Sequence, residues 1–384
     1  MSRYHAYLKK AVAILEAYKG QEPFSVFIRQ QFSLDRKMGS TDRKSVRHYC
    51  YCYFRLGKAL PEASTTDRIL WGLILCGSGN DPLLALEHPT VNTAVEEGSL
   101  LEKRTQLLPQ VFPYNELLSA SLTNSAWALS IWEQPSLFIR MRPGSEEPVM
   151  EALQRQSIAF EKVGAHTLSL PSATSLSSWP GLNRDFVIQD LSSQRVASLL
   201  SLLPEPAKKK MWDCCAGSGG KSILAIDVLG PLSLSVSDKR ETILRQLKQR
   251  FAQAGVIDYR SYELDLTRSL PASFTDRFPF IWADVPCSGS GTWSRTPEQL
   301  YYFEASTLDQ YRHLQQTILR TAITRLQPGG YLLYSTCSVF ACENEQQVTW
   351  LEEQLGLRCV KQQLFNGAAE KADTLFAALL QKPD

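Results

Sequence analysis

Lys210-Met-Trp-Asp-Cys-Cys-Ala-Gly-Ser-Gly-Gly-Lys-Ser222 joins a short apolar run to a glycine-rich turn and then to a helical pattern. Such a turn lets backbone amides approach a ligand closely, and the N-terminus of the following helix favours negative charge. The spacing does not match G-x-x-x-x-G-K-[ST], which a phosphate-binding Walker loop requires. A nucleoside cofactor is compatible with this turn, although the turn alone has little specificity.

Short apolar runs alternate with helical stretches on the C-terminal side of this turn. Such alternation predicts a doubly wound α/β fold, in which a parallel sheet carries helices on both faces. Ligands of these sheets bind outside the carboxyl ends of the strands. The expected strands are Lys210–Cys215, Leu232–Val236, Ser261–Leu264, Phe278–Ala283 and Gly330–Ser335, closed by Leu357–Val360 and an antiparallel Thr374–Leu380.

The length of 384 residues predicts more than one domain. Residues 1–130 carry helical periodicity and predict an all-helical region. Residues 131–190 alternate strand and helix patterns, which predicts a small α+β module of the ferredoxin or RRM-like type. Residues 191–384 form the sheet domain, which begins with a helix expected from Leu191 to Leu203.

Composition is ordinary for a soluble globular protein, with 44% hydrophobic and 21% charged residues. The longest apolar run, Ile69–Cys76, is far shorter than the roughly 20 residues of a membrane span. The N-terminus lacks the compact apolar region of a signal peptide, so a cytoplasmic protein without a membrane partner is expected. Nine cysteines without paired CxxC knuckles indicate free thiols and no metal site.

Two carboxylates follow consecutive expected strands. Asp238 lies 19 residues after Gly219, a spacing at which an acid commonly binds a ribose diol. Asp265 occupies the corresponding place after the next strand. Taken singly, Asp238 is equally typical of a helix N-cap and Asp265 of a turn. Their joint placement favours an adenosine site.

Two cysteines follow the next two strands, Cys287 in Asp284-Val-Pro-Cys287 and Cys337 in Tyr334-Ser-Thr-Cys337. Sequential strands are usually neighbours about 4.8 Å apart, so both thiols are expected to face one cavity. A single cysteine is more often a packing residue, and a redox pair is a further alternative. The polar turns around both cysteines favour a chemical role.

Methylation of cytosine at carbon 5 explains why thiols would be needed here. That carbon is a poor nucleophile until a thiolate adds to carbon 6 and makes an enamine. Asp284 precedes Cys287 by three residues and is placed to stabilise the adduct at ring nitrogen 3. The spacing leaves open which cysteine is the nucleophile.

At these motifs the chain resembles the Nop/Sun (RsmB-like) family of RNA 5-methylcytosine methyltransferases. The glycine turn is similar to D-x-C-A-A-P-G-G-K-T, with Gly217-Ser218 in place of Ala-Pro. Asp284 to Gly291 with Arg295 and Pro297 resembles D-A-P-C-S-G-x-G followed by R-x-P, although Ser294 replaces a basic residue. Tyr334 to Ser338 with Glu343-Asn-Glu345 resembles Y-S-T-C-S with E-N-E.

The resemblance extends along nearly the whole chain. Val187-Ile-Gln-Asp-Leu-Ser-Ser-Gln194 is similar to the family's V-Q-D-x-x-S-Q segment. Residues 135–142 resemble its small α+β module, and residues 39–43 and 53–57 resemble the helical N-terminus of bacterial members. It implies a class I S-adenosylmethionine-dependent methyltransferase fold, Rossmann-like, with a mostly parallel seven-stranded sheet.

The resemblance also implies roles for residues. Cys337 would be the nucleophile and Cys287 would assist product release, whereas DNA cytosine methyltransferases use the Pro-Cys cysteine. With Asp284 these are the expected catalytic residues. The residues expected to bind S-adenosylmethionine are Cys215, Ala216, Gly217, Gly219, Gly220, Lys221, Asp238, Asp265 and Asp284.

The partner expected from the resemblance is RNA, ribosomal RNA first and transfer RNA as the alternative, with the protein acting as a monomer. The net charge of +2 does not itself indicate a nucleic acid, so local basic clusters would have to bind it, and such clusters are more often solvated faces. Rival readings are a non-catalytic RNA-binding assembly factor and methylation of DNA or protein. The expected RNA contacts are Arg36, Lys37, Arg43, Lys44, Arg140 and Arg295.

Overall fold

The computed structural model describes residues 2–35, 37–77, 80–87, 97–122 and 126–384. Contacts within the chain divide it into two compact units. The first consists of residues 1–118, 122–134 and 292–305, and the second of residues 119–121, 135–291 and 306–384. The expected α+β module and sheet domain therefore share one unit, while a short segment of the sheet domain belongs to the helical unit.

The helical unit contains amphipathic helices that bury one face each. Their shared core includes Ile14, Phe24, Tyr49, Phe54 and Leu73, all at most 2% exposed. The helical pattern predicted for the N-terminal region is confirmed in the residues described. The helices are α1 (Arg3–Ala17), α2 (Phe24–Leu34), α3 (Ser40–Phe54), α4 (Thr65–Leu75), α5 (Pro82–Glu87), α6 (Glu97–Val111), α7 (Ala126–Leu129) and α13 (Pro297–Tyr302), with 3-10 turns η1 (Asn115–Leu117), η2 (Ala120–Leu122) and η3 (Ser130–Trp132).

Helix α13 belongs to the helical unit because buried side chains hold it there. Arg55 is 3% exposed and donates hydrogen bonds to the carbonyls of Ile131 and, at 2.8 Å, Ser294. The hydroxyl of Tyr53 donates to that of Tyr301 at 3.0 Å. A buried guanidinium needs such acceptors, so residues 292–305 are fixed to the helices although they follow a strand of the sheet in sequence.

The α+β module opens the second unit as a four-stranded antiparallel sheet in the order β2-β3-β1-β4. Residues Ile139, Met141, Leu153 and Leu168 bury the sheet against its helix. Strands and a helix alternate here, as the pattern of residues 131–190 predicted. The elements are β1 (Leu137–Met141), α8 (Glu146–Arg155), β2 (Glu161–Lys162), β3 (Thr167–Leu170) and β4 (Phe186–Ile188).

A buried ion-pair network joins this module to the sheet domain. Arg140 of β1 donates to Asp227 at 2.5 Å, and Arg142 donates to the same carboxylate at 2.8 Å. Asp227 lies in helix α11 (Gly220–Leu229). A carboxylate shared by two guanidiniums balances their charge away from solvent. This network explains why the module and the sheet domain form one compact unit.

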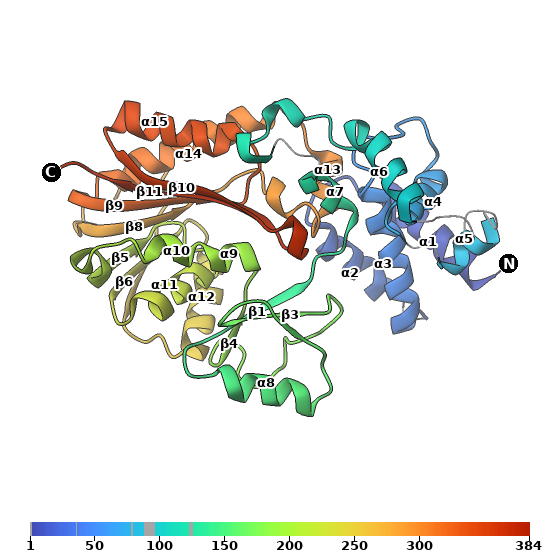
Figure 1. Cartoon of the computed structure of the whole chain (residues 1–384), viewed down its shortest axis with the longest axis horizontal. Coiled ribbons are helices and arrows are strands. Elements are labelled where there is room, and N and C mark those ends of the chain that lie inside the picture. Colours follow the sequence, from blue (N-terminus) through green and yellow to red (C-terminus); the bar gives the residue numbers. More distant parts are fainter. Residues whose placement is uncertain (1, 36, 78–79, 88–96, 123–125) are drawn as a thin grey trace. The chain divides into compact units, whose positions relative to one another are not determined.

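The second sheet has seven strands in the order β10-β11-β9-β8-β5-β6-β7 (Figure 1). Strands β5 to β9 are parallel, and β11 is antiparallel to both neighbours, as the sequence predicted. All seven expected strands are confirmed, with shifted ends. They are β5 (Lys210–Asp213), β6 (Ser233–Asp238), β7 (Tyr259–Glu263), β8 (Phe278–Asp284), β9 (Leu326–Thr336), β10 (Arg358–Asn366) and β11 (Thr374–Gln381).

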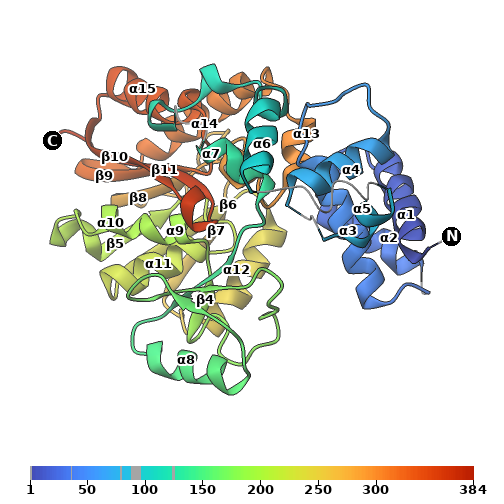
Figure 2. The same ribbon diagram turned by 45° about the vertical axis from the view of Figure 1, so that its right-hand side comes forward.

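Helices cover both faces of this sheet (Figures 1 and 2). Alternate residues along a strand face opposite sides, so Trp282 packs with one helical layer and Ile281 with the other. The helix expected from Leu191 to Leu203 is divided into two short helices. One layer contains α9 (Leu191–Arg195), α10 (Ala197–Leu200), α11 and α12 (Glu241–Gln253). The other layer contains α14 (Thr307–Ile323) and α15 (Glu345–Leu355). The 3-10 turns of this unit are η4 (Glu205–Lys209), η5 (Ser290–Thr292), η6 (Ala341–Glu343) and η7 (Ala368–Glu370).

Candidate active site

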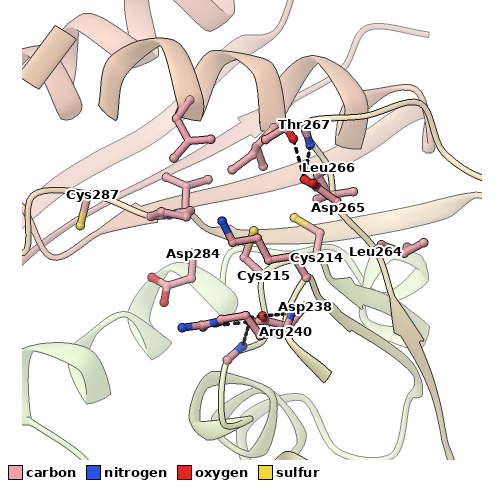
Figure 3. A pocket seen from close by; sticks show the side chains of 16 residues that line it. Cys214, Cys215, Asp238, Arg240, Leu264, Asp265, Leu266, Thr267, Asp284 and Cys287 are labelled. Atoms are coloured by element: carbon pink, nitrogen blue, oxygen red, sulfur yellow. Dashed lines mark hydrogen bonds and ion pairs between the residues drawn. The ribbon is translucent and has the colours of Figure 1, made fainter. Parts of the chain in front are cut away.

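A cavity of about 450 Å³ lies at the carboxyl ends of the parallel strands (Figure 3). Its position is the one that the doubly wound topology predicts, and its size is typical of small-molecule sites. Helix α14 contributes an apolar wall of Leu314 and Ile318, which the sequence gave no reason to place here. The expected cofactor residues that line it are Cys215, Gly217, Asp238, Asp265 and Asp284, joined by Cys287.

The two acids expected to bind adenosine both face this cavity. Asp238 ends β6 and accepts hydrogen bonds from the backbone N–H of Gly217 at 3.2 Å and of Arg240 at 3.0 Å. Asp265 accepts from the backbone and hydroxyl of Thr267, so it also forms the turn that was the alternative reading (Figure 3). These hydrogen bonds fix the position of each carboxylate in the wall of the cavity.

Close packing against a neighbouring side chain requires one of the glycines in the turn, Gly219. Gly219 has φ +81°, and a Cβ there would approach the ring of Phe251 to 2.4 Å. Ser218, at the departure from the family pattern, accepts a hydrogen bond from Arg250 at 3.0 Å. Ala216, Gly219 and Gly220 do not line the cavity, so their role is to shape the turn and start α11.

Lys221 lies in the first turn of α11 and does not line the cavity. Its ammonium contacts the Oδ2 atom of Asp284 at 2.8 Å, and the hydroxyl of Ser335 donates to Oδ1 at 2.8 Å. Burial lowers the pKa of Lys221, but the charges of Asp284 and Cys337 outweigh it and leave that pKa raised. The position of Lys221 therefore gives no support to its expected cofactor role, because its ammonium pairs with Asp284 and interacts with Cys337.

Cys287 and Cys337 lie in contact, as neighbouring strands predicted. The backbone N–H of Cys337 lies 3.3 Å from the sulfur of Cys287, and both side chains are half-buried. Gly291 brings the two loops together, because it donates to the carbonyl of Cys337 at 2.8 Å and a Cβ there would lie 2.0 Å from the carbonyl of Thr374. The hydrogen bond with Cys337, followed by burial, raises the pKa of Cys287.

The residues expected to contact RNA have very different surroundings. Lys37 and Lys44 are exposed, while Arg43 is half-buried and its guanidinium lies 6.0 Å from the ring centre of Phe32. Arg295 is half-buried. Arg36 lies outside the described residues.

Arg140 requires a correction. It is 5% exposed and committed to Asp227 and, at 2.9 Å, to Gln189. Its burial lowers its pKa, and Asp227 partly restores it. The sequence pattern showed a charged residue on a strand but not that the strand packs against α11, so the expectation that Arg140 contacts RNA was wrong.

The described residues contain no cluster of three or more His, Cys, Asp or Glu side chains suited to a metal ion. None of their helices is both long enough and apolar enough to cross a bilayer.

Comparison with known proteins identifies the family. The family model of the 16S rRNA methyltransferase RsmB/F matches residues 199–377, which include both cysteines and the cavity. Residues 199–377 therefore match the Nop/Sun family. Its match to Ribosomal RNA small subunit methyltransferase B of Xanthomonas campestris is 33% identical over 204 residues, which is 50% of this chain and 45% of that protein.

The chain is also similar to a second methyltransferase and to a solved structure. The tRNA (cytosine(72)-C(5))-methyltransferase NSUN6 of Mus musculus is 33% identical over 175 residues, 42% of this chain and 36% of that protein. The chain thus matches less than half the length of either relative. The crystal structure of PH0851 matches with a TM-score of 0.70 at 16% identity, covering 99% of this chain and 98% of that one. The fold is that of class I methyltransferases.

Proposed function

We propose that this Nop/Sun protein is an S-adenosylmethionine-dependent RNA (cytosine-5) methyltransferase. The observation that carries the proposal is the contact between two thiols beside the Lys221–Asp284 ion pair, at the edge of a nucleoside-sized cavity. Two half-buried thiols beside a partly buried ion pair are more typical of a catalytic site than of a binding module. The relatives named above carry activities of this class.

The residues of the cavity fit the cofactor. Asp238 and Asp265 present carboxylate oxygens for the hydroxyls of a ribose and the donors of a base, and Leu266 and Ile318 supply apolar walls for the adenine ring. When bound, S-adenosylmethionine supplies an electrophilic methyl group. The cavity extends to Asp284 and Cys287, so a bound nucleoside and the thiols would share one site.

The chemistry assigned to the chain starts at Cys337. Its thiolate adds to carbon 6 of cytosine near the ammonium of Lys221, whose pKa the charge of Cys337 helps to raise. Asp284, oriented by Lys221 and Ser335, stabilises the adduct at ring nitrogen 3. After carbon 5 has accepted the methyl group, a base takes the proton of carbon 5, the carbon–sulfur bond breaks, and the sulfur of Cys337 leaves as thiolate. Cys287 assists this release.

Ribosomal RNA is the proposed substrate, because the family model and the longer of the two matches reported are those of ribosomal RNA methyltransferases. Transfer RNA is the second candidate, since NSUN6 acts on it by name and is equally identical over its match. Bisulfite sequencing of ribosomal and transfer RNA after incubation with the protein separates these substrates.

The test of the mechanism uses both cysteine variants with carbon-5-tritiated RNA. We expect Cys337→Ala to release no tritium, because no adduct forms without the nucleophile. Cys287→Ala should instead accumulate a covalent protein–RNA adduct that resists denaturing electrophoresis. Cys359→Ala, in the edge strand β10, is the matched control and should keep full activity.

Two outcomes would contradict the proposal. Normal turnover by Cys337→Ala would reassign the nucleophile. Absence of tritium release by the unaltered protein on both RNA classes would favour a non-catalytic assembly factor.

A further inference from the structure

The two cysteine loops are tied together by a carboxylate outside the cofactor cavity. Glu343, in turn η6, is fully buried, and its Oε1 atom accepts from the backbone N–H of Ser288 at 2.9 Å. Its Oε2 atom accepts from the hydroxyls of Ser288 at 2.5 Å and Ser338 at 2.6 Å. Ser288 follows Cys287 directly and Ser338 follows Cys337, so one side chain holds both loops.

Neutral groups surround this carboxylate. Gln315 of α14 donates to Oε1 at 3.0 Å, and the hydroxyl of Tyr334 donates to the backbone carbonyl of Glu343 at 2.5 Å. None of the ion pairs found within the described residues involves Glu343. A buried carboxylate without a cation is costly, and hydrogen-bond donors offset that cost only in part. Its retention beside two reactive thiols suggests a use for the negative charge.

We propose that Glu343 is a positioning residue which clamps the two cysteine loops and, through its negative charge, reserves the role of nucleophile for Cys337. This inference rests on the proposed function. The charge acts unequally: Glu343 adds to the effects that raise the pKa of Cys287, after the hydrogen bond with Cys337, burial and the charge of Cys337. Lys221 provides a charge of the opposite sign, and the charge of Cys337 contributes to the raised pKa of Lys221.

Other titratable groups near Cys287 do not replace Glu343. Besides Cys337, the thiol of Cys287 interacts with the phenols of Tyr311 in α14 and Tyr334 in β9. Burial raises the pKa of both phenols, so they are uncharged at neutral pH. Glu343 is therefore a carboxylate whose charge opposes ionisation of Cys287.

The variant Glu343→Gln removes the charge and can retain the bonds. Its amide oxygen can accept from Ser288 N–H and Gln315, while its NH₂ group faces two hydroxyls that can rotate to accept. The probe is iodoacetamide, with labelling of the Cys287 and Cys337 peptides followed by mass spectrometry from about pH 6 to about pH 10. We expect Cys287 to label faster at neutral pH, by about tenfold for each unit that its pKa falls.

Two controls separate charge from packing. Glu345→Gln changes the neighbouring acid, which accepts from Ser119 at 2.9 Å and touches neither cysteine loop, and should leave both profiles unchanged. Glu343→Asp keeps the charge but shortens the reach, so it should lower kcat while the labelling midpoint of Cys287 stays above that of Cys337. A merely structural role would lower the Tm of both Glu343 variants without moving the midpoint of Cys287.

The result that overturns the inference is an unchanged Cys287 profile in a folded Glu343→Gln protein. If that variant does not fold, the unaltered protein decides: Cys337 must label before Cys287 as pH rises, and the reverse order contradicts the inference. Neither readout needs methyl transfer. An inactive Cys337→Ala protein combined with an unmoved Cys287 profile would therefore sink this inference and leave the proposed function standing.

Discussion

Replacing Asp213 by Asn should stabilise the protein at neutral and alkaline pH. Asp213 ends β5, is 1% exposed, and accepts one hydrogen bond, from Ser222 at 2.6 Å. No partner for its Oδ1 atom occurs among the described residues. Burial, only partly offset by Ser222, raises the pKa of Asp213 from 3.8 to about 7. Between about pH 4 and about pH 7, Asp213 of the folded protein therefore holds a proton that the unfolded chain has lost.

The direction and the magnitude of this change in unfolding free energy follow from proton linkage. A carboxyl with a raised folded-state pKa contributes stability that is complete below the unfolded pKa and is lost as pH rises through the folded one. The window for Asp213 runs from about pH 4 to about pH 7. A shift of about 3 units corresponds to about 4 kcal/mol of unfolding free energy over the whole window, of which about 3 kcal/mol is lost above about pH 5.

The assay is urea unfolding of the full chain, followed by tryptophan fluorescence at about pH 5 and about pH 8. Asp213→Asn stays neutral, so its advantage over the unaltered protein should grow by about 3 kcal/mol between these pH values. Asp276→Asn is the control: the hydrogen bond from Lys210 lowers the pKa of Asp276, so this substitution should destabilise the protein by the same amount at both pH values. An Asp213→Asn difference that is the same at both pH values would refute the reasoning.

Two further predictions concern ligands. Asp238→Ala should weaken binding of S-adenosylhomocysteine by about 10- to 100-fold in calorimetry, because a charged acceptor at the ribose contributes about 1.5–3 kcal/mol; exposed Asp258→Ala is its control, and unchanged affinity would count against the ribose assignment. Neutralising exposed Lys37 and Lys44 should reduce the slope of log affinity for RNA against log salt by up to about 0.7 per residue. An unaltered slope would exclude these lysines, and Lys208→Ala serves as the matched surface change.

Much of the fold was predictable because apolar periodicity reports burial. The buried strands β5, β8 and β9 have continuous apolar runs, whereas β10 extends to Asn366, beyond the expected Val360. The missed part, Lys361 to Asn366, is mostly polar because β10 is an edge strand that is largely exposed. Apolar patterning cannot detect such a strand.

The site was predictable where chemistry and strand ends coincide, as for Cys287, Cys337, Asp238 and Asp265. It was less predictable where tertiary packing decides. Leu314 and Ile318 reach the cavity because α14 crosses the sheet there, and no local pattern encodes that placement. The position of Lys221 beside Asp284 likewise depends on where the first turn of α11 points.

The ranking of the two cysteines shows what a structure adds to a motif. Both thiols follow strand ends and both sit in polar turns, so the sequence treats them alike. Their charged neighbours differ, since Lys221 interacts with Cys337 and Glu343 with Cys287. A cation favours a thiolate and a carboxylate opposes it. This difference in neighbouring charges supports the proposal that Cys337 is the nucleophile, and the order in which the two thiols react with iodoacetamide tests it without any substrate.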